Sequence, residues 1–357
     1  MAEASQYKVL SSLGCGSEHI VYKVELNVNS ELYAIKLEKS AGVGQLKNEI
    51  QMLQKLNGIE GVPQIKHFGQ TREQKQFLIV PLYHCSLLEL AKSRKLSQTQ
   101  ILTIGLRIIE IIEKVHQQNI LHLDIKPENI MLSQQSSNDQ DILRPGFIQL
   151  IDFGLSQQFN ENSESLQDVF IGSLNFASRS SHEGTHLGYK DDLESLLYVL
   201  LYIRDFRLPW SENTFWGYQE SDFEMVGQIK SSFFKTKLLQ QQSNLNFYPF
   251  MTYIDQLTHN LMPDYDYIKK LFAQMIYASY SLKSIQNQEK KYVFSGQFQR
   301  ETIFENSETI NISLDKFPKS NNYEENENFH DSISTLVSKM IGQYTTHQIK
   351  SIKDISQ

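Results

Sequence analysis

The stretch His122-Leu123-Asp124-Ile125-Lys126-Pro127-Glu128-Asn129 is the most informative part of this sequence of 357 residues. A second short motif, Asp152-Phe153-Gly154, follows it. A positioned carboxylate can orient a hydroxyl group, and a lysine can neutralise the charge of a phosphate. Amide and carboxylate oxygens, here from Asn129 and Asp152, are ligands that magnesium accepts. The two motifs in this order favour a site that handles a phosphate and a metal ion.

A glycine-containing turn lies near the N-terminus, in Leu13-Gly14-Cys15-Gly16-Ser17-Glu18-His19-Ile20-Val21. Glycine pairs also mark ordinary turns, so this motif is a weak indicator when taken alone. Apolar runs at residues 7–10 and 21–24 flank it and predict the two strands of a hairpin.

A lysine and a glutamate follow on two further predicted elements. Lys36 lies in the apolar run Tyr33-Ala34-Ile35-Lys36-Leu37, which predicts a strand. Apolar residues at helical spacing in residues 46–56 predict a helix that carries Glu49. Taken alone, each residue has an ordinary structural interpretation, such as a solvated lysine or a surface glutamate.

All these motifs together resemble those of eukaryotic protein kinases. Residues 122–129 are similar to the catalytic loop, with Leu123 where arginine is usual. Residues 152–154 are similar to the metal-binding loop. The turn is similar to the kinase glycine-rich loop, with His19 at the position of the third glycine.

The resemblance implies an α+β, bilobal protein-kinase fold. A small lobe with an antiparallel sheet and one helix is expected at residues 1–83, and a larger, mainly helical catalytic lobe at residues 84–296. Residues 297–357 are polar and predict a largely disordered tail. Apolar spacing within it predicts a helix at residues 332–341, which would dock on the chain's own large lobe or bind a partner. A polar insertion at residues 133–141 predicts a loop.

Roles for the catalytic residues follow from the resemblance, with ATP and Mg²⁺ as cofactors and Ser/Thr-containing proteins as substrates. Asp124 would orient the substrate hydroxyl, and Lys126 would neutralise the γ-phosphoryl group. Asn129 and Asp152 would bind Mg²⁺.

A nucleotide site is implied in the same way. Lys36, held by an ion pair with Glu49, would grip the α- and β-phosphates of ATP. Val80 would be the gatekeeper beside the adenine, which would bond the Pro81 carbonyl and the Tyr83 N–H. The residues expected to bind the nucleotide are Leu13, Gly14, Gly16, Val21, Ala34, Lys36, Glu49, Val80, Pro81, Tyr83 and Met131.

A series of motifs in the large lobe narrows the resemblance. Gly172-Ser-Leu-Asn-Phe-Ala-Ser-Arg-Ser-Ser-His182 stands where most protein kinases carry Ala-Pro-Glu. Asp191-Asp-Leu-Glu-Ser195, Leu208-Pro-Trp210 and Pro263-Asp-Tyr-Asp-Tyr267 follow. The series resembles the casein kinase 1 family over about residues 7–275 and implies phosphorylation of serine or threonine. Asp192 is expected to hold the backbone of the catalytic loop.

Three positions depart from that family. The resemblance implies that the family has arginines there, which would form an anion pocket for primed substrates, those that already carry a phosphate. This sequence has Asn175, Tyr189 and Lys190 in their place. A single lysine gives a point charge rather than the fork of a guanidinium. We therefore expect little preference for primed substrates, unless Lys230 or Lys235 rebuilds the pocket.

Two other departures favour a rival interpretation, a catalytically weak pseudokinase that serves as a scaffold. Leu123 cannot pair with a phosphorylated activation loop, so activation through this residue is not expected. His19 adds a side chain where glycine allows close backbone approach, which predicts weak ATP affinity that improves in His19→Gly. A kinase-like enzyme that acts on small alcohols is a further rival. Phosphate transfer to casein or to small alcohols would separate the three.

Composition sets limits on other classes of function. The net charge of −7 argues against nucleic-acid binding, which calls for a basic face. The sequence has no apolar run long enough for a membrane span, and its first residues lack a signal-peptide pattern. Cys15 and Cys85 are the only cysteines, which favours a reducing compartment. We expect a monomer in the cytoplasm, the nucleus or both.

Overall fold

The computed structural model describes residues 7–42, 44–135, 139–160, 169–211, 220–236 and 245–294. The chain divides into two compact units, residues 1–275 and 276–357, and the sheet and cleft considered below lie in the first. The predicted tail, with its helix at residues 332–341, lies outside the described residues. The same is true of residues 136–138 in the predicted insertion. The lobe boundaries stay predictions.

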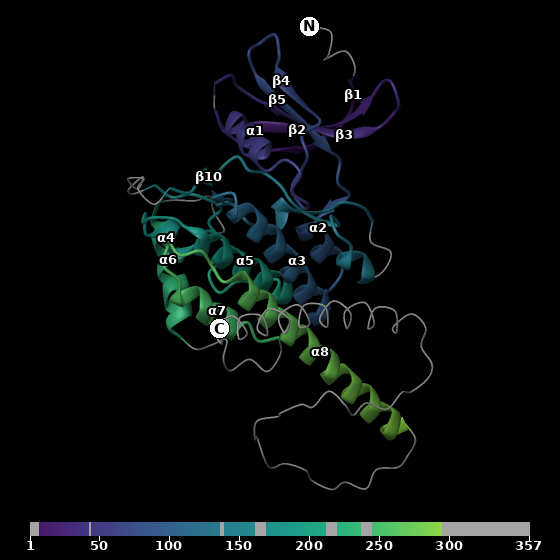
Figure 1. Cartoon of the computed structure of the whole chain (residues 1–357), viewed down its shortest axis with the longest axis vertical. Helices are drawn as coiled ribbons and strands as arrows, with labels where there is room; N and C mark the ends of the chain where they lie inside the picture. The colour runs from purple at the N-terminus through teal and green to yellow at the C-terminus, as the bar shows by residue number, and fades with distance from the viewer. Residues whose placement is uncertain are drawn as a thin grey trace, which may run out of the picture. The chain divides into compact units, whose positions relative to one another are not determined.

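The N-terminal part of the first unit is a five-stranded antiparallel sheet with a helix beside it (Figure 1). Val24 and Tyr33, on neighbouring strands, lie in a small apolar core with Ile79. Helix α1 (Gln45–Lys55) packs against β5 and buries Leu46 and Ile50, as its helical spacing predicted. In spatial order the strands are β1 (Tyr7–Cys15), β2 (His19–Leu26), β3 (Leu32–Glu38), β5 (Gln76–Pro81) and β4 (His67–Gln70).

The C-terminal part of the first unit is mainly helical (Figure 1). Its helices are α2 (Leu87–Ser93), α3 (Gln98–His116), α4 (Arg179–His182), α5 (Tyr189–Asp205), α6 (Glu220–Lys235), α7 (Tyr248–Gln256) and the beginning of α8 (Tyr265–Phe294). Helix α3 is largely buried and packs against α5, in keeping with its nearly continuous apolar sequence. Capping boxes that begin at Ser86 and Ser97 start α2 and α3. None of the described helices is long and apolar enough to cross a membrane.

Short strands lie within the connections between the helices. β6 (Cys85–Ser86), β8 (Ile130–Leu132) and β9 (Ile148–Leu150) form a three-stranded sheet, and β7 (Ile120–Leu121) pairs with β10 (Gln157–Gln158). Short 3-10 helices lie at Pro127–Asn129 and Asp139–Leu143. The motif at residues 122–129 therefore lies between β7 and β8, and residues 152–154 follow β9. This arrangement confirms the predicted α+β, bilobal fold.

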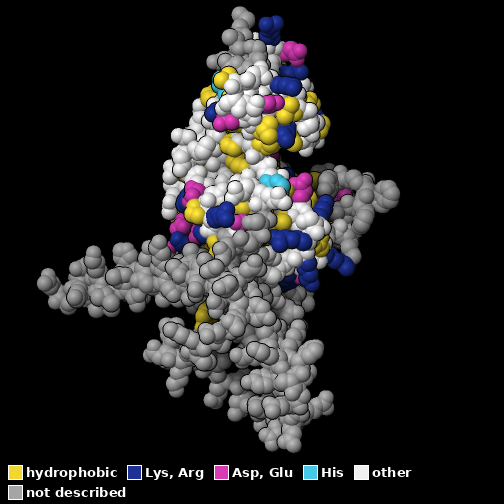
Figure 2. Space-filling model, turned by 90° about the vertical axis from the view of Figure 1, so that its right-hand side faces the viewer, with side chains coloured by type: hydrophobic (Ala, Val, Ile, Leu, Met, Phe, Trp, Pro, Cys, Tyr) yellow, Lys and Arg dark blue, Asp and Glu magenta, His cyan; other side chains and the backbone are white. Residues whose placement is uncertain are grey.

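Charged side chains are seen over both lobes on the face shown in Figure 2, whereas apolar side chains gather mainly over the small lobe. Hydrophobic side chains gather over the small lobe, which exposes Val9, Leu10 and Leu32. Basic and acidic side chains are interspersed over the large lobe, so that charge of both signs is mixed on this face.

Candidate active site

A cleft of about 800 Å³ is lined by residues of both lobes. Motifs that are far apart in the chain meet there. Asp124 contacts this lining through Lys126, whose Nζ lies 2.7 Å from Asp124 Oδ2. The sequence-predicted residues in the lining are Leu13, Gly14, Gly16, Val21, Ala34, Lys36, Glu49, Val80, Pro81, Tyr83, Lys126, Asn129, Met131 and Asp152. The structure thus brings the whole predicted set together.

The loop at residues 122–129 is held from below by Asp192 on α5. Its carboxylate accepts the backbone N–H groups of His122 at 2.7 Å and Leu123 at 2.8 Å, and contacts His116 Nε2 at 2.8 Å. Burial acts to raise the pKa of Asp192, but the hydrogen bond and charge of His116 outweigh it and lower the pKa. Leu123 has φ +64°, a conformation that is unfavourable for leucine and needs such support. The predicted role of Asp192 is confirmed.

Asp124 lies at the centre of a hydrogen-bonded cluster. Lys126 Nζ donates to Asp124 Oδ2 at 2.7 Å and to Ser173 Oγ at 2.9 Å. Ser173 Oγ donates in turn to Asp124 Oδ1 at 2.8 Å. Asn129 Nδ2 donates to the Asp124 carbonyl at 2.9 Å and to its carboxylate at 3.1 Å. Both carboxylate oxygens are therefore oriented by fixed donors.

Ser173 is a site residue to which sequence reasoning assigned no role. It follows Gly172, whose φ of +107° favours glycine. A side chain at Gly172 would also place its Cβ 2.9 Å from the Leu123 carbonyl oxygen. This close approach brings residues 171–178, which we call the 171–178 loop, against the catalytic-loop motif. The sequence did offer one sign of this role, because Ser173 carries a hydroxyl group and directly follows Gly172 in the motif at residues 172–182.

Lys36 joins the small lobe to the loop at residues 152–154. Its Nζ lies 2.7 Å from Glu49 Oε2, as predicted, and 2.7 Å from Asp152 Oδ1. Burial alone would raise the pKa of Asp152, but the charge and hydrogen bond of Lys36 lower it to about 2. Asn48 Nδ2 donates to the carbonyl oxygens of Gly154 at 3.0 Å and Ser156 at 2.9 Å, which ties α1 to the same loop.

Asn129 and Asp152 fit the predicted Mg²⁺ site by the chemistry of their atoms. Asn129 uses its amide nitrogen on Asp124, which orients the amide so that its oxygen is the ligand atom. Asp152 contacts Lys36 through Oδ1, and its carboxylate has a second oxygen. Mg²⁺ is usually bound by one or two carboxylates together with substrate phosphates, so this small oxygen set suits it.

The predicted adenine end of the cleft lies where β5 ends. Val80 pairs with Ala34 across β3 and β5, and both line the cleft. Tyr83 OH donates to Gln149 Oε1 at 3.2 Å, and burial raises the pKa of Tyr83. Met131, on β8, lies in the wall of the same cleft.

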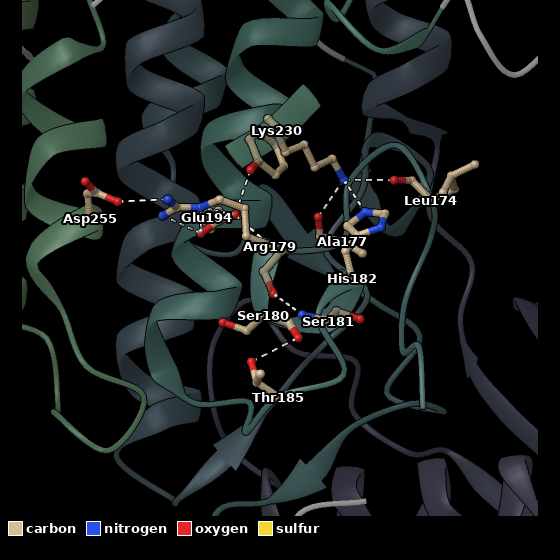
Figure 3. A network of polar contacts seen from close by, with 12 residues as sticks. Leu174, Ala177, Arg179, Ser180, Ser181, His182, Thr185, Glu194, Lys230 and Asp255 are labelled. Atoms are coloured by element: carbon tan, nitrogen blue, oxygen red, sulfur yellow. Dashed lines mark hydrogen bonds and ion pairs between the residues drawn. The ribbon is translucent and has the colours of Figure 1, made fainter. Parts of the chain in front are cut away.

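Lys230, on α6, holds the 171–178 loop from inside the large lobe (Figure 3). Its fully buried ammonium donates to the Leu174 and Ala177 carbonyl oxygens at 2.8 and 2.6 Å, and lies 3.0 Å from His182 Nε2. His182 Nδ1 contacts the Phe223 carbonyl at 2.8 Å, so Nε2 is the acceptor in the neutral ring. Lys230 therefore offers no charge to solvent, and the alternative that it rebuilds an anion pocket is wrong.

Arg179 and Glu194 fasten the end of the same loop (Figure 3). The buried Glu194 carboxylate accepts from the Arg179 backbone N–H at 2.7 Å and from Nε at 3.2 Å. Arg179 also pairs with Asp255 at 2.8 Å and stacks 3.4 Å from the Phe234 ring centroid. Sequence reasoning missed this pair, although both residues lie in quoted motifs.

Comparison with known proteins decides the family. The protein kinase domain family matches residues 7–353, which is nearly the whole chain. The chain belongs to the protein kinase family. It is 28% identical over 312 residues to a probable casein kinase I homolog of Encephalitozoon cuniculi, covering 81% of this chain and 91% of that protein. It is 26% identical over 282 residues to casein kinase I homolog 2 of Schizosaccharomyces pombe, covering 76% of this chain and 63% of that protein.

Two of the three residues that stand in place of the expected arginines, Tyr189 and Asn175, have defined contacts in the structure. Tyr189 is buried, donates from its hydroxyl to Asn119 Oδ1 at 2.9 Å and packs its ring on Phe159. The Asn175 carbonyl accepts from Trp210 Nε1 at 2.9 Å. Tyr189 thus makes its contacts through its side chain, whereas the Asn175 contact is made by the backbone, and Asn175 Oδ1 is buried without a hydrogen-bond partner among the described residues. Neither residue offers a cationic side chain.

Proposed function

We propose that this chain is a serine/threonine protein kinase similar to casein kinase I, which uses ATP and Mg²⁺ and transfers the γ-phosphoryl group to protein hydroxyls. The observation that carries the proposal is the cluster of Asp124, Lys126 and Ser173, in which a carboxylate, an ammonium and a hydroxyl group meet within 2.9 Å. The similarity to casein kinase I homologs supports the choice of serine and threonine.

The chain's own residues act mainly by position and charge. The Asp124 carboxylate would accept a hydrogen bond from the substrate hydroxyl and so orient its oxygen toward the phosphate. Lys126 would neutralise charge on the phosphoryl group as it moves. Ser173 and Lys126 keep the Asp124 carboxylate in place, which lowers the cost of reaching the reactive geometry.

The remaining predicted residues would hold the cofactors. Bound Mg²⁺-ATP supplies the phosphoryl group and a metal that balances its charge. Lys36, kept in place by Glu49, would contact the α- and β-phosphates, and Asn129 and Asp152 would offer oxygen ligands to the metal. The residues that would bind the rest of the nucleotide are Leu13, Gly14, Gly16, Val21, Ala34, Val80, Pro81, Tyr83 and Met131.

Phosphate transfer by the purified chain tests the proposal. Mg²⁺-ATP with labelled γ-phosphate would be offered with casein or with small alcohols, and the labelled amino acids in casein would be identified. We expect phosphoserine and phosphothreonine, and their loss in Asp124→Asn. The matched control is Asp205→Asn, at an exposed carboxylate outside the cleft lining. If phosphate were transferred to neither acceptor, the chain would be a scaffold. If phosphate were transferred to the alcohols alone, the chain would be a small-molecule kinase.

A further inference from the structure

His19 is buried in the cleft although it stands where the glycine-rich loop has its third glycine. It is the first residue of β2, is 8% exposed and lines the same cleft as Lys36 and Asp152. Val21 lies two residues further along β2 and lines the cleft too. Side chains two apart on a strand share a face, so the imidazole and Val21 lie on the face that the nucleotide would meet.

The backbone that carries His19 is firmly held. The Gly16 N–H donates to the His19 carbonyl at 2.9 Å, which closes the tip of the loop. The Lys39 N–H donates to the Glu18 carbonyl at 2.8 Å, and the Lys39 ammonium contacts the Gly16 carbonyl. His19 is also in register with Glu38 on β3. These contacts hold the backbone of the turn in place and so limit the positions that the His19 imidazole can adopt.

The ring nitrogen Nε2 of His19 is buried and has no hydrogen-bond partner among the residues that the structure describes. Buried polar groups in proteins are nearly always hydrogen-bonded, so an exception of this kind calls for a partner. Burial, and then the positive charge of Lys36, lower the pKa of His19 to about 4 against the opposing effect of Asp152. The ring is thus neutral near pH 7 and has one N–H, and the tautomer with the proton on Nε2 would have that N–H to donate.

The charge around this nitrogen favours an anionic acceptor. Lys36 and Lys39 both act on the ring electrostatically, and Lys36 is the residue expected to meet the nucleotide phosphates. We propose that His19 Nε2 donates a hydrogen bond to a phosphate oxygen of the bound nucleotide, so that His19 is a nucleotide-binding residue rather than an obstruction. This inference rests on the proposed function, because it takes the phosphate-binding end of the cleft from it.

Measuring nucleotide binding to the full chain distinguishes two roles of His19, a hydrogen-bond donor to the nucleotide and a steric obstruction of the site. Dissociation constants for ADP and adenosine, each with Mg²⁺, would be measured by calorimetry for the wild type, His19→Leu, His19→Gln and His19→Gly. Leucine keeps bulk without a donor, glutamine keeps an N–H donor, and glycine removes both. We expect leucine and glycine to weaken ADP binding by about three- to tenfold, the worth of one net hydrogen bond. Glutamine should retain most of the affinity, and adenosine should bind all four forms alike.

Each other outcome overturns the inference. Tighter ADP binding by His19→Gly would show that the ring obstructs the site, as the sequence alone predicts. Equal binding by the leucine and glutamine variants would show that only size matters. A similar loss for adenosine would show a structural effect on the lobe. Failure of the proposed function would look different, because wild-type protein would bind nucleotides in this series and still transfer no phosphate. Absence of ADP binding by the wild type would overturn both.

Discussion

The ammonium of Lys36 lies 2.7 Å from the carboxylate of Asp152. The contact joins the small lobe to the loop that would hold the metal. It also fixes the protonation of Asp152, because a carboxylate beside a buried cation stays ionised to low pH. The loop thus carries its ligand in the charged form that a metal ion requires.

The contribution of the Lys36–Asp152 contact to the free energy of unfolding should depend on pH. Asp152 has a folded pKa of about 2, below its ordinary value of 3.8. A lowered carboxyl pKa stabilises the fold above the unfolded-state pKa, and that contribution is lost as the pH falls toward 2. We expect Lys36→Met to reduce the free energy of unfolding in urea clearly at pH 5 and much less at pH 2.5. Lys75→Met, which removes a pair between a partly exposed lysine and the exposed Glu73, should have only a small effect. A difference that stays constant with pH would contradict this account.

Catalysis should depend on both aspartates. Asp124→Asn would remove the group proposed to orient the nucleophile, and Asp152→Asn would weaken a proposed metal ligand. We expect each to lower kcat by on the order of a hundredfold or more in steady-state assays with Mg²⁺-ATP. Near-wild-type turnover in either purified variant would exclude that residue from the proposed role.

Val80 should make the kinase sensitive to inhibitors that are bulky beside the adenine. It is a small residue, and it lines the cleft opposite Ala34 in the sheet register. Val80→Phe should abolish this inhibition through steric overlap in a close-packed site. Inhibition curves measured at ATP concentrations matched to each KM would check it. If both forms were inhibited equally, the placement of Val80 beside the adenine would be wrong.

Priming phosphates should matter little for substrate choice. Asn175 and Tyr189 have no guanidinium, and the Lys230 ammonium is occupied by carbonyl oxygens. Peptides with and without a phosphoserine on the N-terminal side of the target serine should differ less than tenfold in kcat/KM. A tenfold gain on priming, worth about 1.4 kcal/mol, would contradict this prediction. Lys190→Ala would then show whether that lysine supplies the charge.

Lys230→Met should destabilise the large lobe. It leaves the Leu174 and Ala177 carbonyl oxygens without their donor, at a cost of about 2 to 4 kcal/mol, which the removal of a buried charge offsets only in part. Urea unfolding would measure the loss. Lys235→Met, at an exposed position on the same helix, is the matched control and should change stability by less than about 0.5 kcal/mol. Equal stability of the two variants would mean that Lys230 is not an anchor.

Much of the candidate site could be predicted because its motifs are short and keep a fixed order along the chain. Lys36 lies on a predicted strand and Glu49 on a predicted helix, and their pairing followed from the resemblance to protein kinases. The role of Asp192 also followed from the resemblance, through the motif at residues 191–195. Localisation and the monomeric state stay predictions.

Contacts between distant elements could not be predicted from the sequence. A lysine such as Lys230 on an amphipathic helix is usually exposed, and only the fold brings three acceptors to it. Arg179 and Glu194 lie on different helices, and their pairing depends on how α4 and α5 pack. Ser173 stood in a recognised motif, but its hydroxyl acquires a role only when Gly172 lets the loop approach Leu123.

The internal position of Lys230 shields the anchor of the 171–178 loop from dissolved ions. Burial also lowers the pKa of Lys230 well below its ordinary value, so the loss of its proton is the change of medium to which this anchor is open. Dissolved ions weaken contacts between surface charges, whereas they hardly affect charges that are enclosed by protein. Neither changes in salt concentration nor the action of a phosphatase can reach this anchor. The 171–178 loop is therefore tied to helix α6 from inside the fold, and we expect a movement of that helix to be passed on to the loop.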